Sequence, residues 1–275
     1  MVTRQRHNRD INKLRLPGEL SPACIADPST LTNPAFPYWL PADKRVTPLD
    51  FLRGNPPENG GSANTAANRL RWILKDTMGA DGAFGRRRQE LAILRGCSAE
   101  EVGDDDVVES YRDECDPAKP EGNFMLQYLQ EGALGCVFGR ALFVHGGLDA
   151  ATVGTVPAAA GKELRVRAWV KKLNAWAQSQ IAEFVGDPYS YAQPGLGYAE
   201  HGGPAAARMG SALTDYGVSG GNGGATVVYK SFLCNGNGQH LEAGVQDYLL
   251  ADGVCVGGVV CTCVLGGCTL TYMCT

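Results

Sequence analysis

Charged residues are few in this sequence of 275 residues, at 20%, and the two signs nearly balance, with 25 Lys and Arg against 29 Asp and Glu. The formal net charge of −4 leaves no broad basic field, so we expect no nucleic-acid partner. No apolar run approaches the length of about 20 residues that a membrane-spanning helix needs, so we expect no membrane partner. The first ten residues, M-V-T-R-Q-R-H-N-R-D, lack the apolar core of a secretory signal. The compartment is therefore unknown, with the cytoplasm as the default expectation.

Histidine is also scarce, with four residues in the chain. The sequence contains no H-E-x-x-H, no P-loop, no G-x-S-x-G and no G-x-G-x-x-G after a strand. These absences remove the usual signatures of zinc proteases, P-loop nucleotide-binding proteins, serine hydrolases and dinucleotide-binding proteins. Any catalytic chemistry must be sought in less familiar combinations of side chains.

Cysteine is abundant, with ten residues, but the spacing of the cysteines fits no zinc-binding pattern. Half of them crowd the end of the chain, at positions Cys255, Cys261, Cys263, Cys268 and Cys274. No histidine lies among them. Because no secretory signal is present, a disulfide framework is not expected. We expect reduced, mostly structural thiols.

The composition, with 44% hydrophobic residues, fits a soluble globular protein of one large domain or two small ones. The many prolines and glycines of residues 17–61 predict a long irregular connection. We expect the acidic run 104–106 to be a solvated face or loop. Apolar periodicity predicts helices, and a capping box is expected at 98–101. The expected helices are 63–78, 86–95, 124–130, 163–185 and 241–250. We also expect glycine-rich and tyrosine-rich surface loops over 186–224, a strand at 226–229, and a strand that begins near 254.

The most informative stretch is Ala141 to Leu148, A-L-F-V-H-G-G-L. Together with L-G-C-V-F before Gly139, it predicts a β-hairpin whose second strand ends at His145. A strand end holds an imidazole rigidly, and the two glycines allow backbone or ligand to approach closely. His145 is therefore a candidate metal ligand; the alternative is a core histidine bonded to a backbone carbonyl.

The second candidate group is Asn8, Arg9 and Asp10 near the start of the chain. Asn8 offers a neutral oxygen, Arg9 can hold a phosphate through two parallel hydrogen bonds, and Asp10 can orient a neighbour or accept a proton. An oxygen ligand, an arginine and a distant histidine are groups that a two-metal phosphoryl-transfer site requires. The alternative is a surface asparagine and a salt bridge at a helix start.

Together these stretches resemble the calcineurin-like metallophosphoesterases, in which a G-N-H-(E/D) motif precedes a strand ending in H-G-G-(L/I/V). Here His7-Asn8-Arg9-Asp10 matches the first motif, as in an uncharacterised branch with G-N-R-D, and His145-Gly146-Gly147-Leu148 matches the second. Two further stretches also resemble that branch: A-N-R-L-R-W-I-L-K-D-T-M-G-A and V-V-Y-K-S-F-L-C-N-G-N-G-Q-H-L.

The resemblance implies an α/β or α+β fold, part of a four-layer αββα sandwich, and hydrolysis of a phosphoric ester of unknown class. It implies two divalent metal ions, of Mn, Fe, Zn or Mg, with Asn8 and His145 as ligands. Arg9 occupies the position of the histidine that protonates the leaving group in that family, so Arg9 would bind phosphate and stabilise charge instead. Asp10 occupies the acidic position that orients the catalytic residue.

The family's D-x-H, G-D-x-x-D-(R/N)-G and closing G-H motifs are not found in this chain. The resemblance therefore implies a partial phosphoesterase domain over 1–254, with a largely helical insertion at 17–123 and a Cys/Gly/Val-rich tail at 255–275. The chain would be an N-terminally truncated member with an aberrant C-terminus, and we expect it to be inactive alone because several of the family's metal ligands are missing. The alternatives are an inactive pseudo-phosphatase that serves as an interaction protein, and a non-functional remnant. The oligomeric state stays open.

Overall fold

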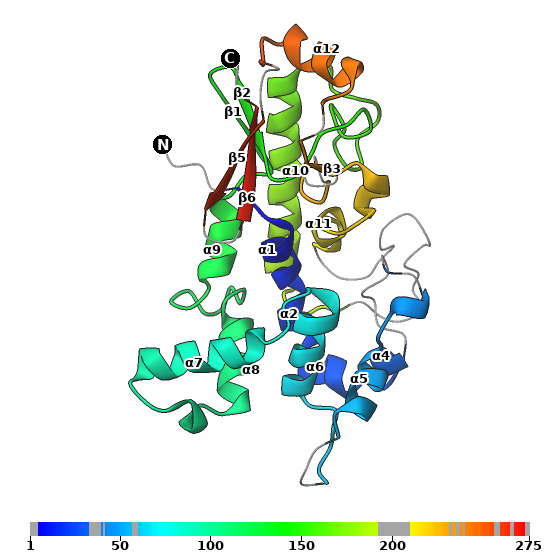
Figure 1. Ribbon diagram of the computed structural model, residues 1–275. Coiled ribbons are helices and arrows are strands. Elements are labelled where there is room, and N and C mark those ends of the chain that lie inside the picture. The colour runs from blue at the N-terminus through cyan, green and yellow to red at the C-terminus, as the bar shows by residue number, and fades with distance from the viewer. Residues whose placement is uncertain are drawn as a thin grey trace.

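The chain folds as an α+β protein, in which a small antiparallel sheet lies beside a long helix at one end and many of the shorter helices lie at the other end (Figure 1). The computed structural model describes residues 5–32, 40, 42–56, 60–191, 210–230, 233–234, 237–238, 240–255, 259–264 and 267–272. No four-layer sandwich is seen in these ranges. None of the helices they contain is long and apolar enough to cross a membrane.

The α-helices are α1 (Asn8–Asn12), α2 (Leu16–Glu19), α3 (Pro22–Ala26), α4 (Ser29–Thr32), α5 (Pro48–Gly54), α6 (Ala66–Trp72), α7 (Ala83–Arg95), α8 (Asp104–Asp113), α9 (Phe124–Glu131), α10 (Val166–Gly186), α11 (Ser211–Tyr216) and α12 (Ala243–Ala251). Shorter helical turns are η1 (Lys13–Arg15), η2 (Ala42–Lys44), η4 (Ala99–Glu101) and η5 (Gly221–Gly224), and η3 (Ile73–Thr77) is a π-helix. The strands are β1 (Gly135–Phe138), β2 (Ala141–Val144), β3 (Leu233–Cys234), β4 (Asn237–Gly238), β5 (Val259–Val264) and β6 (Gly267–Tyr272).

The predicted hairpin is confirmed, because β1 and β2 pair antiparallel with Phe138 opposite Ala141 and Gly135 opposite Val144. Gly139, in the turn, has a φ of +58°, a conformation that favours glycine. Asn174 of α10 fixes the other end of the hairpin, since its side chain accepts from Leu134 N at 2.7 Å and donates to Gly135 O at 2.8 Å. The strand that leads to His145 therefore has a defined position.

Two further strands complete this sheet, in the order β1-β2-β6-β5. β6 pairs antiparallel with β2, with Leu270 opposite Val144, and β5 pairs antiparallel with β6. The stretch that we expected to be a tail after 255 thus contains strands of the main sheet. Its alternation of Val, Thr and Cys is typical of strands, because β-branched residues favour extended backbone.

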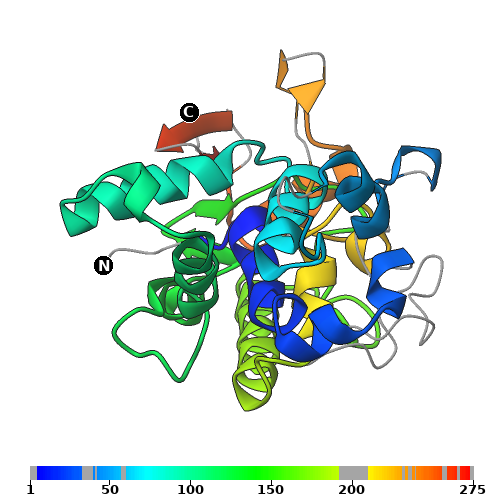
Figure 2. The same cartoon turned by 90° about the horizontal axis from the view of Figure 1, so that it is seen from below.

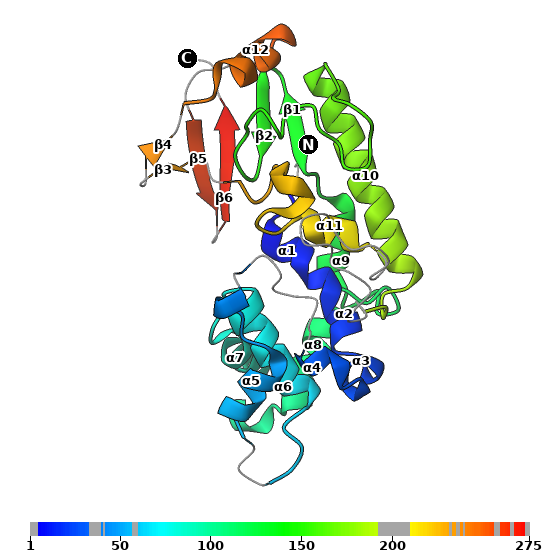
Figure 3. The same cartoon turned by 90° about the vertical axis from the view of Figure 1, so that its right-hand side faces the viewer.

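Two clusters of buried apolar side chains stabilise the fold. The first joins the sheet to α9, α10, α11 and α12, and Trp169 at its centre is fully buried. The second lies among α2, α5, α6, α7 and α8. Figure 3 shows the sheet and α10 above, the helices α4 to α8 below, and α1 between the two parts. Seen from below, α1 and α2 lie near the middle of the molecule (Figure 2).

The connection 17–61 is more helical than we expected. α3 and α5 begin at Pro22 and Pro48, and each is preceded by a capping side chain, Ser21 and Thr47. Proline is well suited to the first turn of a helix, because the N–H that it lacks has no partner inside the helix anyway. The prolines that suggested irregular chain therefore start short helices.

The acidic run 104–106 also differs from our expectation, because it forms the first turn of α8. Carboxylates are favourable there, since the helix dipole is positive at its N-terminus. Asp106 accepts from Gly103 N at 2.8 Å, and Asp104 pairs with both Arg71 and Arg88. The capping box at 98–101 is confirmed, with Ser98 N donating to the Glu101 carboxylate at 2.8 Å.

The remaining predicted elements need smaller changes. The helices at 86–95, 124–130, 163–185 and 241–250 are confirmed with shifted ends, and 63–78 divides into α6 and the π-helix η3. The expected loop 186–224 contains α11 and η5, and its residues 192–209 lie outside the described chain. The strand expected at 226–229 is absent from the described structure, where this segment is bent. Cys255 is disulfide-bonded, unlike the reduced thiols that we expected, whereas Cys24, Cys97 and Cys115 are reduced.

Candidate functional site

The three candidate residues near the N-terminus occupy the first turn of α1. The chain reaches this helix through an isolated parallel bridge between Gln5 and Ala133, beside the start of β1. Arg6 is fully buried and donates from Nε to Leu129 O at 2.7 Å. His7 then has extended backbone, with φ −96° and ψ 156°, and its carbonyl accepts from Ile11 N at 3.0 Å. The start of α1 is thus anchored to α9 and to the sheet.

Within α1, Arg9 is more exposed to solvent than Asn8 and Asp10 are. Asn8 is half-buried and Arg9 is exposed. Burial raises the pKa of Asp10 above its ordinary value, and the opposing influences are the charges of His7 and Lys13 and a hydrogen bond from the His7 backbone. The Asp10 carboxylate therefore lies beside the backbone N–H of His7, at the start of α1.

His145 follows the last residue of β2 directly, as the hairpin predicted. The next two backbone amides are fixed, because Gly146 N donates to Val227 O and Gly147 N to Lys230 O, each at 2.6 Å. A Cβ on Gly146 would lie 2.9 Å from the carbonyl oxygens of both Val227 and Lys230. The segment that we expected to be a strand at 226–229 is instead packed against the H-G-G turn through its carbonyls.

An ion pair reinforces this turn. Lys230 pairs with Asp149, which also accepts hydrogen bonds from Thr152 N at 2.9 Å and Thr152 Oγ1 at 2.7 Å. Partial burial tends to raise the pKa of Asp149, but the hydrogen bonds from Lys230 and Thr152 outweigh it and the pKa is lowered. Asp149 therefore stays ionised and holds segment 225–230 beside His145.

The two motifs meet in space. The rings of His7 and His145 have centroids 4.2 Å apart, with 38° between their planes. His7 immediately precedes Asn8, so the structure brings the N-R-D turn next to the end of the H-G-G strand. Both imidazoles are half-buried and each is held on an anchored backbone.

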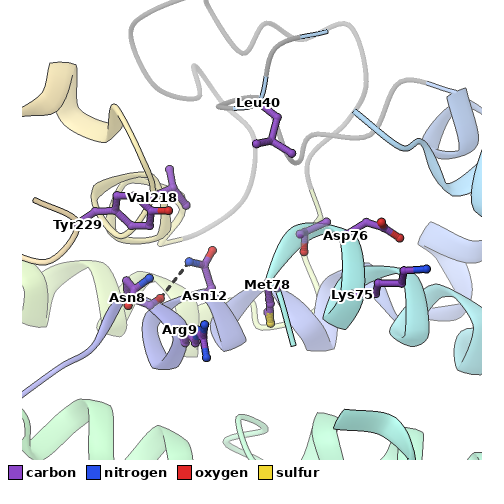
Figure 4. A pocket seen from close by; sticks show the side chains of 11 residues that line it. Asn8, Arg9, Asn12, Leu40, Lys75, Asp76, Met78, Val218 and Tyr229 are labelled. Atoms are coloured by element: carbon purple, nitrogen blue, oxygen red, sulfur yellow. Dashed lines mark hydrogen bonds between the residues drawn. The ribbon is translucent and has the colours of Figure 1, made fainter. Parts of the chain in front are cut away.

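A pocket of about 310 Å³ opens beside Asn8 and Arg9 (Figure 4). Figure 4 shows Asn8 and Asn12 on one wall with Tyr229 and Val218 close by, while Met78 lies opposite and Leu40 points in from above. Lys75 and Asp76 extend away from Asn8 in this view. The described pocket walls do not include His145. The pocket therefore combines two cations, Arg9 and Lys75, the carboxyl group of Asp76 and two amide groups with an apolar side.

The wall opposite α1 is the π-helix η3. Met78 N donates to Ile73 O at 3.1 Å, a π-type bond, and Thr77 Oγ1 donates to the same carbonyl at 2.7 Å. π-helical turns are rare and are frequent at functional sites. Burial raises the pKa of Asp76 in this turn. The helical region 17–123 thus supplies one side of the pocket.

The candidate ligands do not fit a centre of two metal ions. Asn8 and His145 supply one amide oxygen and one imidazole, and no group of three or more His, Cys, Asp or Glu is placed to hold a metal ion in the described parts of the chain. Two ions bridged in one site need more donors than these. We therefore derive no chemical step through a two-metal centre.

The sequence did not single out His7, Lys75, Asp76 or Tyr229 as site residues. His7 stands where the resembling family has glycine, so the motif itself gave no reason to assign it a role. The contact between the His7 and His145 rings depends on the tertiary fold. The π-helix has no sequence signature that periodicity could detect.

Comparison of the chain with models of protein families, with curated proteins and with solved structures finds no match.

Proposed function

We propose that this protein binds a phosphoric ester in the pocket beside α1 and that hydrolysis of this ester is its activity. The observation that supports the proposal is the contact of His7 with His145, because it places the H-N-R-D and H-G-G-L motifs side by side. We propose further that the sheet and its helices are part of the four-layer sandwich that the resemblance implies.

In this proposal, Arg9 binds the phosphoryl group. A guanidinium offers several N–H donors in one plane and stays charged near neutral pH, so it can hold two phosphate oxygens and neutralise their charge. Asn8 lies beside Arg9 on the same pocket wall and adds an amide donor. The apolar side chains of Met78, on the opposite side, and of Val218, near Asn8, fit the ester's organic part.

A second candidate is binding without hydrolysis, as in a pseudo-phosphatase. It is favoured by the shortage of metal donors around Asn8 and His145 in the described chain. The same pocket would then serve recognition of a phosphorylated partner, and the loops of 186–224 would be an interaction surface.

The test is an assay of p-nitrophenyl phosphate hydrolysis with added Mn²⁺, Fe²⁺, Zn²⁺ or Mg²⁺, together with calorimetric titration of inorganic phosphate. We expect Arg9→Gln to weaken phosphate binding by about tenfold or more, because a hydrogen bond to a charged group contributes about 1.5–3 kcal/mol. The matched control is Arg53→Gln on α5, where the arginine side chain is 71% exposed and does not line the pocket.

Turnover that needs a metal and falls in Arg9→Gln supports hydrolysis. Phosphate binding that depends on Arg9 without turnover supports the pseudo-phosphatase. If phosphate binds equally to the wild type and to Arg9→Gln, the pocket is not a phosphate site and both candidates fail.

A further inference from the structure

One buried side chain in the wall of the pocket has an oxygen atom without a partner. Asn12, the last residue of α1, lines the pocket and is only 7% exposed. Its nitrogen Nδ2 donates to Asn8 O at 2.9 Å, whereas its oxygen Oδ1 has no hydrogen-bond partner. A buried acceptor without a donor carries a desolvation cost, so such an atom in a pocket wall points to a ligand that supplies the donor.

The orientation of the Asn12 amide is fixed by its neighbour. If the oxygen and nitrogen of this amide were exchanged, the oxygen would face Asn8 O, and two acceptors would lie at hydrogen-bond distance with no proton between them. The nitrogen is therefore the atom that faces Asn8. Figure 4 shows the consequence, since the Asn12 oxygen points away from Asn8 and into the pocket below Leu40.

The surroundings of Asn12 decide which kind of donor fits there. Tyr229 lies close to Asn12 and is 44% exposed, so its ring offers a surface for a carbon skeleton and its hydroxyl group can donate or accept (Figure 4). The pocket lining carries two cations, Arg9 and Lys75, against the carboxyl group of Asp76. These cations repel a ligand ammonium group, so a neutral hydroxyl group is the donor that suits Asn12.

We propose that the phosphoric ester of this pocket is a sugar or polyol phosphate, with Asn12 Oδ1 accepting a hydrogen bond from one of its hydroxyl groups. This inference rests on the proposed function, because Arg9 would hold the phosphoryl group, and it adds Asn12 as the residue that selects the alcohol. Arg9 and Asn12 form an i,i+3 pair on α1, so one small molecule can reach both. A volume of about 310 Å³ lies at the lower end of the range for small-molecule pockets and fits such an ester.

The test compares two ligands that differ only in hydroxyl groups. Glycerol 3-phosphate and n-propyl phosphate share the carbon chain and the phosphoryl group, and only the former has free hydroxyl groups on the chain. We expect calorimetric titration of the wild type to show glycerol 3-phosphate binding at least about tenfold more tightly, since propyl phosphate leaves Asn12 Oδ1 without a donor. If hydroxyl groups were not recognised, the more apolar propyl phosphate would bind equally well or better. The sign of the difference therefore decides, and no variant is needed.

Variants then assign this preference to Asn12. We expect Asn12→Leu, which removes the acceptor and nearly keeps the size of the side chain, to lose the preference, measured as the ratio of the two dissociation constants. Because both ligands are compared within one variant, a general loss of affinity cancels in this ratio. Asn123→Leu is the matched control, because Asn123 is also 7% exposed but does not line the pocket, and its ratio should equal that of the wild type. A preference that persists in Asn12→Leu would overturn the assignment.

The outcomes separate this inference from the proposed function. Equal affinity for the two esters, with inorganic phosphate bound through Arg9, overturns the inference and leaves the proposed function standing. Failure to bind inorganic phosphate or either ester removes both. A preference for glycerol 3-phosphate without turnover supports the inference and removes hydrolysis.

Discussion

At the scale of single residues, the turn after β2 has no space for a side chain at Gly146. Gly146 lies under two carbonyl oxygens, and Lys230 N is also only 3.0 Å from the position of a Cβ. A methyl group there would push segment 225–230 away and break the hydrogen bonds that hold it. The position of His145 depends on this packing.

We expect Gly146→Ala to lower the free energy of unfolding by about 1–3 kcal/mol, as overpacking of a well-filled site does. Urea denaturation measures the change. Gly244→Ala is the matched control, because a Cβ on Gly244 of α12 meets nothing within 4 Å, and its effect should stay within about 0.5 kcal/mol. Equal stability of the two variants would contradict the packing described for the turn.

Some residues of the site could be placed from the sequence and others could not. The apolar run before His145 and the glycines after it gave a strand end, which is a local property. The partners of Gly146 and Gly147 lie at Val227 and Lys230, and no local pattern predicts such contacts. The sequence indicated a strand at 226–229 because Val and Tyr favour strands, whereas the carbonyls of this segment pair with the turn.

At the scale of elements, the N-terminus of α10 obtains a cap from a distant residue. The residue before α10, Arg165, makes no capping bond with its own side chain. Instead Asp252, at the end of α12, accepts from Arg167 N at 3.1 Å and from Arg165 Nε at 2.6 Å. These bonds tie the longest helix of the described chain to α12.

We expect Asp252→Ala to lower the free energy of unfolding by about 1 kcal/mol at neutral pH, the usual effect of losing a helix cap. The hydrogen bond from Arg167 N, followed by that from Arg165, lowers the pKa of Asp252 below its ordinary value in the folded protein. A carboxyl group whose pKa is lowered by folding stabilises the protein above its unfolded pKa and loses this effect as the pH falls through the folded pKa. The difference between wild type and variant should therefore shrink below about pH 4.

Denaturation in urea over pH 3 to 7 measures this difference. Asp247→Asn is the control, because Asp247 lies on the same helix and is exposed. A difference that persists unchanged to pH 3 would show that Asp252 does not act through its charge.

The observed helix boundaries show where apolar periodicity predicted the helices correctly and where it did not. Apolar periodicity located α9, α10 and α12, since their buried faces repeat at helical spacing. It failed for residues 17–61, because prolines that begin helices resemble prolines that interrupt them, and only the capping side chains Ser21 and Thr47 distinguish the two cases. The π-helix at 73–77 buries Ile73 and Leu74 in the second cluster, and apolar periodicity alone does not distinguish it from an α-helix.

At the scale of the whole molecule, one run of helix joins the two hydrophobic clusters. Residues 8–19 are helical without interruption through α1, η1 and α2. Ile11 and Leu14 belong to the first cluster, whereas Leu16 and Leu20 belong to the second. Glu114, almost fully buried, pairs with Lys13 at 2.8 Å and with Arg87 at 3.6 Å and adds a second link.

We therefore expect the two clusters to unfold together. Trp72 reports on the second cluster and Trp169 on the first, and labelling with 5-fluorotryptophan gives each a separate ¹⁹F signal. Both signals should disappear at the same urea concentration, as a two-state transition requires. Earlier loss of the Trp72 signal would show that the helical region is an independent unit. Undispersed signals before any urea is added would favour the alternative that the chain is a non-functional remnant.

The class of the fold could be predicted from the sequence, but the pairing of its distant strands could not. Helical periodicity and one hairpin indicated a mixed fold, and the α+β arrangement agrees. The pairing of β6 with β2 escaped prediction, because strand partners far apart in the chain are chosen by tertiary packing and not by local sequence. For the same reason the meeting of His7 and His145 is visible only in the folded chain.

The hydrogen bonds of Gly146 and Gly147 have a practical consequence for spectroscopy. Amide protons held in this way exchange with solvent only when the local structure opens, so their exchange rates measure how often segment 225–230 leaves the turn. These two glycines directly follow His145. They would act as internal sensors, whose deuterium uptake falls when a ligand occupies the neighbourhood of His145.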